Sequence, residues 1–90
     1  MNKEATPTPR RAPNESPSAQ PTVVEALYRA EGAKLWRSIC GFAGSRTVAD
    51  DAVAEAFAQL LRRGSAVLDP KAWVWIAAFR IAAGELKRQR

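Results

Sequence analysis

The residues of this sequence that could do chemistry are carboxylates near its middle and cations near its end. The acidic residues cluster at Asp50, Asp51 and Glu55. Asp51 and Glu55 are four residues apart, so that on a helix both side chains project from one face. Such a pair could bind a partner surface that presents arginines. The alternative is a helix start, where carboxylates suit the positive end of the dipole. Spacing alone favours the helix start, since surface carboxylates are common there.

Patterns of catalytic and metal-binding residues are missing from the sequence. The chain has no His and a single Cys, Cys40, which removes the commonest general base and metal ligand. It has neither paired-Cys zinc spacing nor a Gly-rich phosphate loop. We therefore expect no enzyme and no cofactor or metal, and we interpret Cys40 as a small buried thiol.

The net charge of +5 is unevenly distributed over the 90 residues. Residues 69–90 carry five basic and two acidic groups, a net charge of +3. A local excess of this kind indicates a polyanionic partner such as nucleic acid, or simply the solvated end of a helix. Because no run of about 18 apolar residues occurs, we expect a cytoplasmic protein that does not enter a membrane.

Two parts of the chain differ in composition. Residues 1–21 hold five of the six prolines, and we predict a disordered tail there. Residues 22–90 show helical periodicity and no competing strand pattern. We predict one all-α domain, a compact bundle of three helices with short connections.

Capping residues suggest where each helix begins. Thr22 and Glu25 form a capping box for the first helix. Thr47 is the expected N-cap of the second, and Asp69 followed by Pro70 begins the third. The glycines at positions 41, 44 and 64 are expected at the ends of the first two helices.

The helical period also predicts which side chains face the core. In the first helix these are Val24, Leu27, Tyr28, Leu35, Ile39 and Phe42. In the second they are Ala49, Ala52, Val53, Ala56, Phe57, Leu60 and Leu61. In the third they are Ala72, Trp75, Ile76, Phe79, Ala82, Ala83 and Leu86. The opposite side of the third helix then carries Trp73, Ala77, Arg80, Gly84, Lys87 and Arg88.

With these elements in place, the sequence resembles region 2 of the sigma-70 family, specifically its extracytoplasmic-function type. The resemblance lies in Ala49–Phe57 (ADDAVAEAF) and in Asp69–Val74 (DPKAWV). The family reads roughly A-E-D-L-V-Q-E-x-F and D-P-x-A-W-L at these places. Leu27–Arg29 and the basic end Leu86–Arg90 are similar to the family as well. The blocks occur in the family's order and spacing, and the resemblance covers residues 24–90.

The resemblance implies a sigma region 2 type domain that binds RNA polymerase core and promoter DNA. Its second helix would dock on the clamp helices of the beta-prime subunit through Asp51, Glu55, Gln59 and Arg62. Its third helix would recognise and open the −10 element. Strand opening needs cations along the phosphates and aromatic surfaces for unstacked bases, and the candidate DNA-binding residues are Trp73, Arg80, Lys87, Arg88 and Arg90. An anti-sigma factor is a further implied partner.

The chain also departs from the family. Ala52 stands where the family has a larger aliphatic residue and Ala54 where it usually has Gln. Ala78-Phe79-Arg80 stands where the family usually has Ala-Arg-Asn, and Gly84 stands where the family often has Asp. The helix-turn-helix region 4 is absent from this sequence. Two alternatives therefore stay open: a regulatory or decoy protein that binds polymerase or an anti-sigma factor without initiating transcription, and a basic helical domain that binds nucleic acid without polymerase. Trp73 itself is either a DNA contact or a core residue at the rim.

Overall fold

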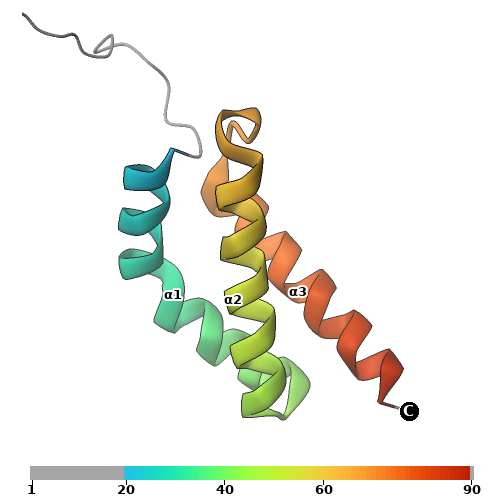
Figure 1. Ribbon diagram of the computed structural model, residues 1–90. Helices are drawn as coiled ribbons and strands as arrows, with labels where there is room; N and C mark the ends of the chain where they lie inside the picture. The colour runs from blue at the N-terminus through green and yellow to red at the C-terminus, as the bar shows by residue number, and fades with distance from the viewer. Residues whose placement is uncertain (1–19, 90) are drawn as a thin grey trace, which may run out of the picture.

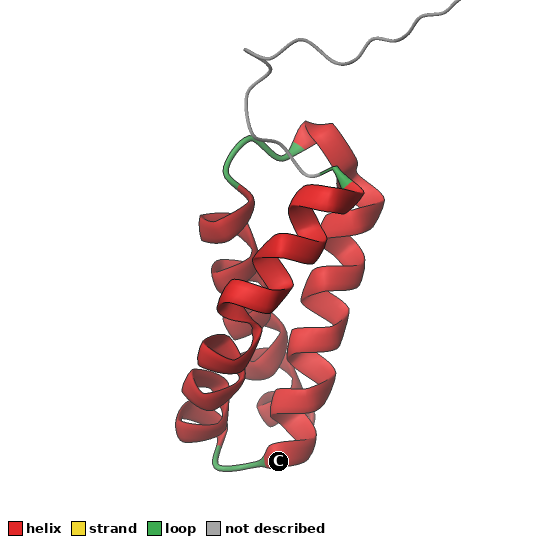
Figure 2. Cartoon of the chain, turned by 90° about the vertical axis from the view of Figure 1, so that its left-hand side faces the viewer, coloured by secondary structure: helices red, strands yellow, loops and turns green. Residues whose placement is uncertain are grey.

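The computed structural model describes residues 20–89, and these residues fold into three α-helices joined by short connections (Figure 1). The helices are α1 (Pro21–Ala43), α2 (Arg46–Arg63) and α3 (Pro70–Arg88), and a short 3-10 helix, η2 (Gly64–Ala66), follows α2. The chain runs along α1, returns along α2 and reverses again along α3 (Figures 1 and 2). No strand occurs within the described residues. The prediction of an all-α, three-helix domain is confirmed.

The predicted disordered tail, residues 1–21, lies outside the described residues except at its last two positions. There the predicted boundary is slightly wrong, because Pro21 is already the first residue of α1. Pro is well suited to this position, since the first turn of a helix leaves its N–H groups without intrahelical partners. None of the helices within residues 20–89 has the length and apolar character that a membrane span requires.

The predicted start was wrong for two helices and correct for the third. Thr22 lies inside the first turn of α1, so the predicted capping box does not form. Thr47 is likewise inside α2, and the N-cap is Ser45, whose hydroxyl accepts a 3.1 Å hydrogen bond from the Val48 backbone N–H. Asp69 caps α3 as predicted, with its carboxylate accepting from the backbone N–H of the third helical residue at 3.2 Å.

Glycines end α1 and α2. Gly44 has φ 66°, and its N–H donates to the Cys40 carbonyl at 2.8 Å. This left-handed conformation is one that Gly adopts without the steric cost of a Cβ. Gly64 follows α2 with φ 57°. The exits at Gly44 and Gly64 are therefore confirmed, whereas Gly41 lies within α1.

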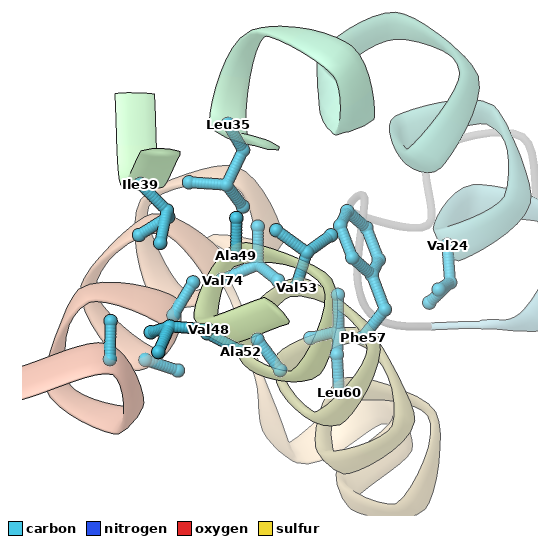
Figure 3. Packing of buried hydrophobic residues seen from close by; sticks show 14 of the residues in the cluster. Val24, Leu35, Ile39, Val48, Ala49, Ala52, Val53, Phe57, Leu60 and Val74 are labelled. Atoms are coloured by element: carbon cyan, nitrogen blue, oxygen red, sulfur yellow. The ribbon is translucent and has the colours of Figure 1, made fainter. Parts of the chain in front are cut away.

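The core lies between the three helices and consists mainly of aliphatic and small side chains (Figure 3). Its largest fully buried side chains are Leu35, Ile39, Val48, Leu60 and Val74. All three helices contribute to this set, so the burial that stabilises each helix comes from the other two. In Figure 3, Phe57 projects from α2 beside Val53 and Leu60.

Several predicted core positions are exposed. Tyr28, Phe42 and Leu61 have 55%, 51% and 51% of their surface accessible. Tyr28 and Phe42 contact the neighbouring helices only through one edge of the ring, against Phe57 and Phe79, so the rest of each side chain stays accessible.

The predicted core face of α3 was wrong in its rotation. Val74, Ala77 and Ala78 point inward, whereas Ile76 is 58% exposed. Ala72 and Ala83, also predicted inside, are exposed as well. The reason is that α3 is apolar on more than one side, and the small side chains at positions 77, 78 and 82 allow closer approach to α1 and α2 than the large ones would.

Candidate nucleic-acid and partner interfaces

A groove between α2 and α3 gathers several of the candidate functional residues. It has a volume of about 570 Å³. Its lining consists of Gln59, Arg63, Trp73, Ile76, Ala77, Arg80 and Ile81. The groove thus combines one large aromatic ring, two guanidinium groups and an amide with an apolar base. That is the chemistry needed to hold an unstacked base beside its phosphates.

Trp73 lies in the first turn of α3 and is half-buried. It packs against the core and also lines the groove, so the two interpretations of this residue are compatible. The guanidinium of Arg63 lies over its ring, 5.4 Å from the centroid. This is within the distance of a cation–π interaction. The pair joins the last turn of α2 to the first turn of α3.

Arg63 is a candidate functional residue that the sequence prediction missed. Arg62 and Arg63 both lie in the last turn of α2, where cations suit the negative end of the helix dipole. The two arginines point to different neighbours. Arg62 pairs with Glu55 on α2, and Arg63 faces α3. A signal was present: Arg63 is four residues after Gln59, so on a helix the two share a side.

The other candidate DNA-binding cations lie farther along α3. Arg80 is exposed and makes no hydrogen bond or ion pair with the described residues. Lys87 follows two turns later on the same side of α3 and is also exposed. Arg88 donates a hydrogen bond to Glu85. Arg90 lies outside the described residues. Among the four candidates within residues 20–89, the structure therefore brings Trp73 and Arg80 to one groove and leaves Lys87 and Arg88 outside it.

The candidate polymerase-binding residues form a stripe along α2, which we call the acidic stripe: Asp51, Glu55, Gln59 and Arg62. Gln59 lies at the edge of this stripe, because it also lines the α2–α3 groove. Glu55 accepts hydrogen bonds from the Gln59 amide at 3.0 Å and from the Arg62 guanidinium at 3.1 Å. These two donors lower the pKa of the Glu55 carboxyl, the Gln59 bond most strongly. Asp51 is exposed and makes no hydrogen bond or ion pair with residues 20–89.

The three clustered carboxylates of the sequence do not act together. Asp50 points toward α1, where it accepts a 2.7 Å hydrogen bond from the indole nitrogen of Trp36. Asp51 and Glu55 lie on the outer side instead. Within the described part of the chain, no three His, Cys, Asp or Glu side chains gather in a way that could hold a metal ion. Asp50 therefore links α2 to α1, whereas Asp51 and Glu55 are exposed at the surface.

Comparison of the chain with protein-family models, with curated proteins and with solved structures found no match. The resemblance to sigma region 2 therefore stays a hypothesis that rests on the residues quoted from the sequence.

Proposed function

We propose that this chain is a sigma region 2 type module of transcription initiation, which binds RNA polymerase core through the acidic stripe and promoter DNA of the −10 element through the α2–α3 groove. The observation that carries the proposal is the arrangement of Arg63, Trp73 and Arg80 around one groove. A protein with this role acts in the cytoplasm, where the polymerase is.

The groove supports binding to opened rather than closed DNA. An aromatic side chain such as Trp73 stabilises an unstacked base by about 1–3 kcal/mol in single-strand binders. Arg63 and Arg80 lie on the same groove, where each could neutralise one phosphate. This electrostatic part of the binding is independent of sequence and weakens as salt rises.

The acidic stripe supports a protein partner that presents cations, as the beta-prime clamp helices would. Asp51 is exposed and available for such a contact. Glu55 already has Arg62 as a partner, so docking would exchange one exposed ion pair for another. Because exposed ion pairs contribute little to stability, that exchange costs little, and Asp51 is expected to dominate the contact.

One observation favours the alternative of a decoy or regulatory protein. Phe79 packs against Phe42 with ring centroids 5.3 Å apart, at a position where the sigma family usually has Arg. The outer side of α3 is thus more apolar than a DNA track requires. Transcription from a template that has only a −10 element separates the two functions, because a decoy yields no transcript.

Co-elution with bacterial RNA polymerase core on a sizing column tests the polymerase interface. We expect the full chain to co-elute and Asp51→Lys to weaken this co-elution. Glu25→Lys is the matched control, because it reverses an exposed carboxylate on α1, away from the acidic stripe. If both variants co-elute like the parent chain, the acidic stripe is not the polymerase interface.

Salt-dependent binding of a labelled single-stranded oligonucleotide tests the groove. Arg80→Gln should reduce the slope of log K against log salt by about 0.7, the contribution of one phosphate contact on a single strand. Arg37→Gln, an exposed cation on α1, should leave the slope unchanged. Equal slopes for the two variants would place the DNA elsewhere.

A further inference from the structure

The side of α3 that faces solvent carries an unusually regular apolar row. Its members are Ala72, Ile76, Phe79, Ala83 and Leu86, with successive spacings of four, three, four and three residues. Ala72, Ile76 and Ala83 are exposed, and Phe79 and Leu86 are half-buried. We call this row the α3 seam. It is separate from the true core face of α3, which is formed by Val74, Ala77, Ala78 and Ala82.

Aromatic side chains widen the α3 seam on the side of α1. Phe42, 51% exposed, packs edge-on against Phe79. Trp75 stacks on the same ring at 6.4 Å. Phe42 and Ile76 are thus large apolar side chains left half exposed on or beside the α3 seam, and adjoining exposed apolar side chains are typical of interaction surfaces.

The spacing identifies the shape of that molecule. Apolar side chains that alternate at four and three residues form the seam of a coiled coil, in which each side chain inserts between four residues of a facing helix. A strand or an irregular loop has no matching period. The α3 seam spans five such positions, so it is long enough to align a helix of similar length.

Charge on the flanks of the seam identifies the chemistry of the molecule. The residues that directly follow Phe79 and Leu86 are Arg80 and Lys87, both exposed cations. On the other flank the accessible positions are Trp75 and Gln89, neither of which is charged, and Ala82 between them is buried in the core. An antiparallel second copy would set the cationic flank against itself. A parallel second copy would set it against an uncharged flank. A helix with carboxylates beside its apolar row would pair its negative charges with Arg80 and Lys87.

We propose that the α3 seam docks an amphipathic helix of another protein, one whose apolar heptad row is flanked by Asp or Glu. This inference goes beyond the proposed function and does not depend on it. Where both hold, the docked helix covers Arg80 and Lys87 and competes with DNA for α3.

The test uses the full chain and a synthetic probe. The probe is a peptide of about three heptads with Leu at the a and d positions and Glu at e and g. Isothermal titration should show one peptide bound per chain. A peptide with Lys in place of Glu should bind at least about tenfold more weakly, because its charges meet Arg80 and Lys87. Equal affinity of the two peptides, or no binding of the Glu peptide, overturns the proposal.

Surface variants locate the binding. Ala83→Gln places an amide in the seam, and Ala54→Gln makes the same change at an exposed site on α2. We expect about a tenfold loss of peptide affinity for Ala83→Gln and none for Ala54→Gln. Thermal melting of both variants shows that each is folded.

Two further outcomes would assign the α3 seam to other occupants and so overturn the proposal. Sedimentation that shows self-association of the parent chain, lost in Ala83→Gln, assigns the seam to a second copy. Single-stranded oligonucleotide binding that falls in Ala83→Gln, with peptide binding unchanged, assigns it to nucleic acid, because Ala83 lies outside the α2–α3 groove. Peptide binding and polymerase co-elution are measured separately, so failure of one proposal is distinguishable from failure of the other.

Discussion

Glu31 in α1 accepts a 3.1 Å hydrogen bond from the indole nitrogen of Trp75 in α3. Glu31 is 8% exposed, and the Lys71 ammonium lies 3.7 Å from its other carboxylate oxygen. A buried carboxylate is stable only with such partners. The contact joins helices at opposite ends of the sequence and holds α3 at one rotation about its axis, because the Trp75 N–H must reach α1.

Loss of this contact is expected to destabilise the domain. Glu31→Ala should lower the free energy of unfolding by about 1–3 kcal/mol, because the indole N–H loses its acceptor in a partly buried site. Glu31→Gln keeps an acceptor oxygen and should cost less. Lys71→Ala removes only an exposed ion-pair partner and should cost less than about 1 kcal/mol. Urea denaturation of the three variants checks this order, and an Ala variant as stable as the Gln variant would contradict it.

Capping residues should differ in their contribution according to their place in the structure. Asp69→Ala and Ser45→Ala each remove an acceptor for a backbone N–H in the first turn and should cost about 1 kcal/mol. Thr22→Ala should leave stability unchanged or slightly raised, because Thr22 lies inside α1 and Ala is the better helix former. Thermal melting distinguishes the three variants. If Thr22→Ala lost as much stability as Asp69→Ala, Thr22 would have to cap α1, which would contradict the structure.

Two glycines should respond in opposite directions to Ala. Gly44→Ala should destabilise by roughly 1–2 kcal/mol, because φ 66° places a Cβ against the following carbonyl. Gly84→Ala should stabilise by up to about 1 kcal/mol, since Gly84 lies inside α3 and an added Cβ meets no atom within 4 Å. Denaturant midpoints of the two variants measure both effects. An unchanged or raised midpoint for Gly44→Ala would show that the backbone at Gly44 is not held in this conformation, and a lowered one for Gly84→Ala would contradict the second prediction.

The carboxyl of Glu55 should titrate below its ordinary pKa of 4.5. The bonds from Gln59 and Arg62 favour the charged form, so they support the folded state above the ordinary pKa. That support is lost as pH falls through the lowered value. NMR titration of the side-chain carboxyl measures the midpoint. Gln59→Ala should raise it, because the Gln59 amide is the largest cause of the shift, and an unmoved midpoint would assign the shift to Arg62 alone.

The rotation of α3 was the part of the fold that periodicity did not predict. Apolar residues occupy both the α3 seam and the true core face. Both rows follow the 3.6-residue period of a helix, so the period does not indicate which side of α3 is buried. The structure buries the side with Val74 and three alanines, and Glu31 holds Trp75 at the edge of the core. Ile76 thereby remains outside.

The candidate sites were partly predictable. Asp51 and Glu55 share a side of α2 because four residues make about one helical turn, whatever the other helices do. Arg63 beside Trp73 was not predictable in the same way. That pair depends on the loop through η2, which brings the end of α2 close to the start of α3.

The sequence by itself determined the number of helices, the Asp69–Pro70 start of α3, the glycine exits and the spacing of the acidic stripe. These features depend on local backbone preferences and on the helical period, which act over a few residues. Only the tertiary structure decided which side of α3 is buried, that Asp50 bonds Trp36, and that Arg63 lies over Trp73. These features depend on how three apolar helices fit together, where side-chain volume and one buried carboxylate choose among packings that local signals leave nearly equal.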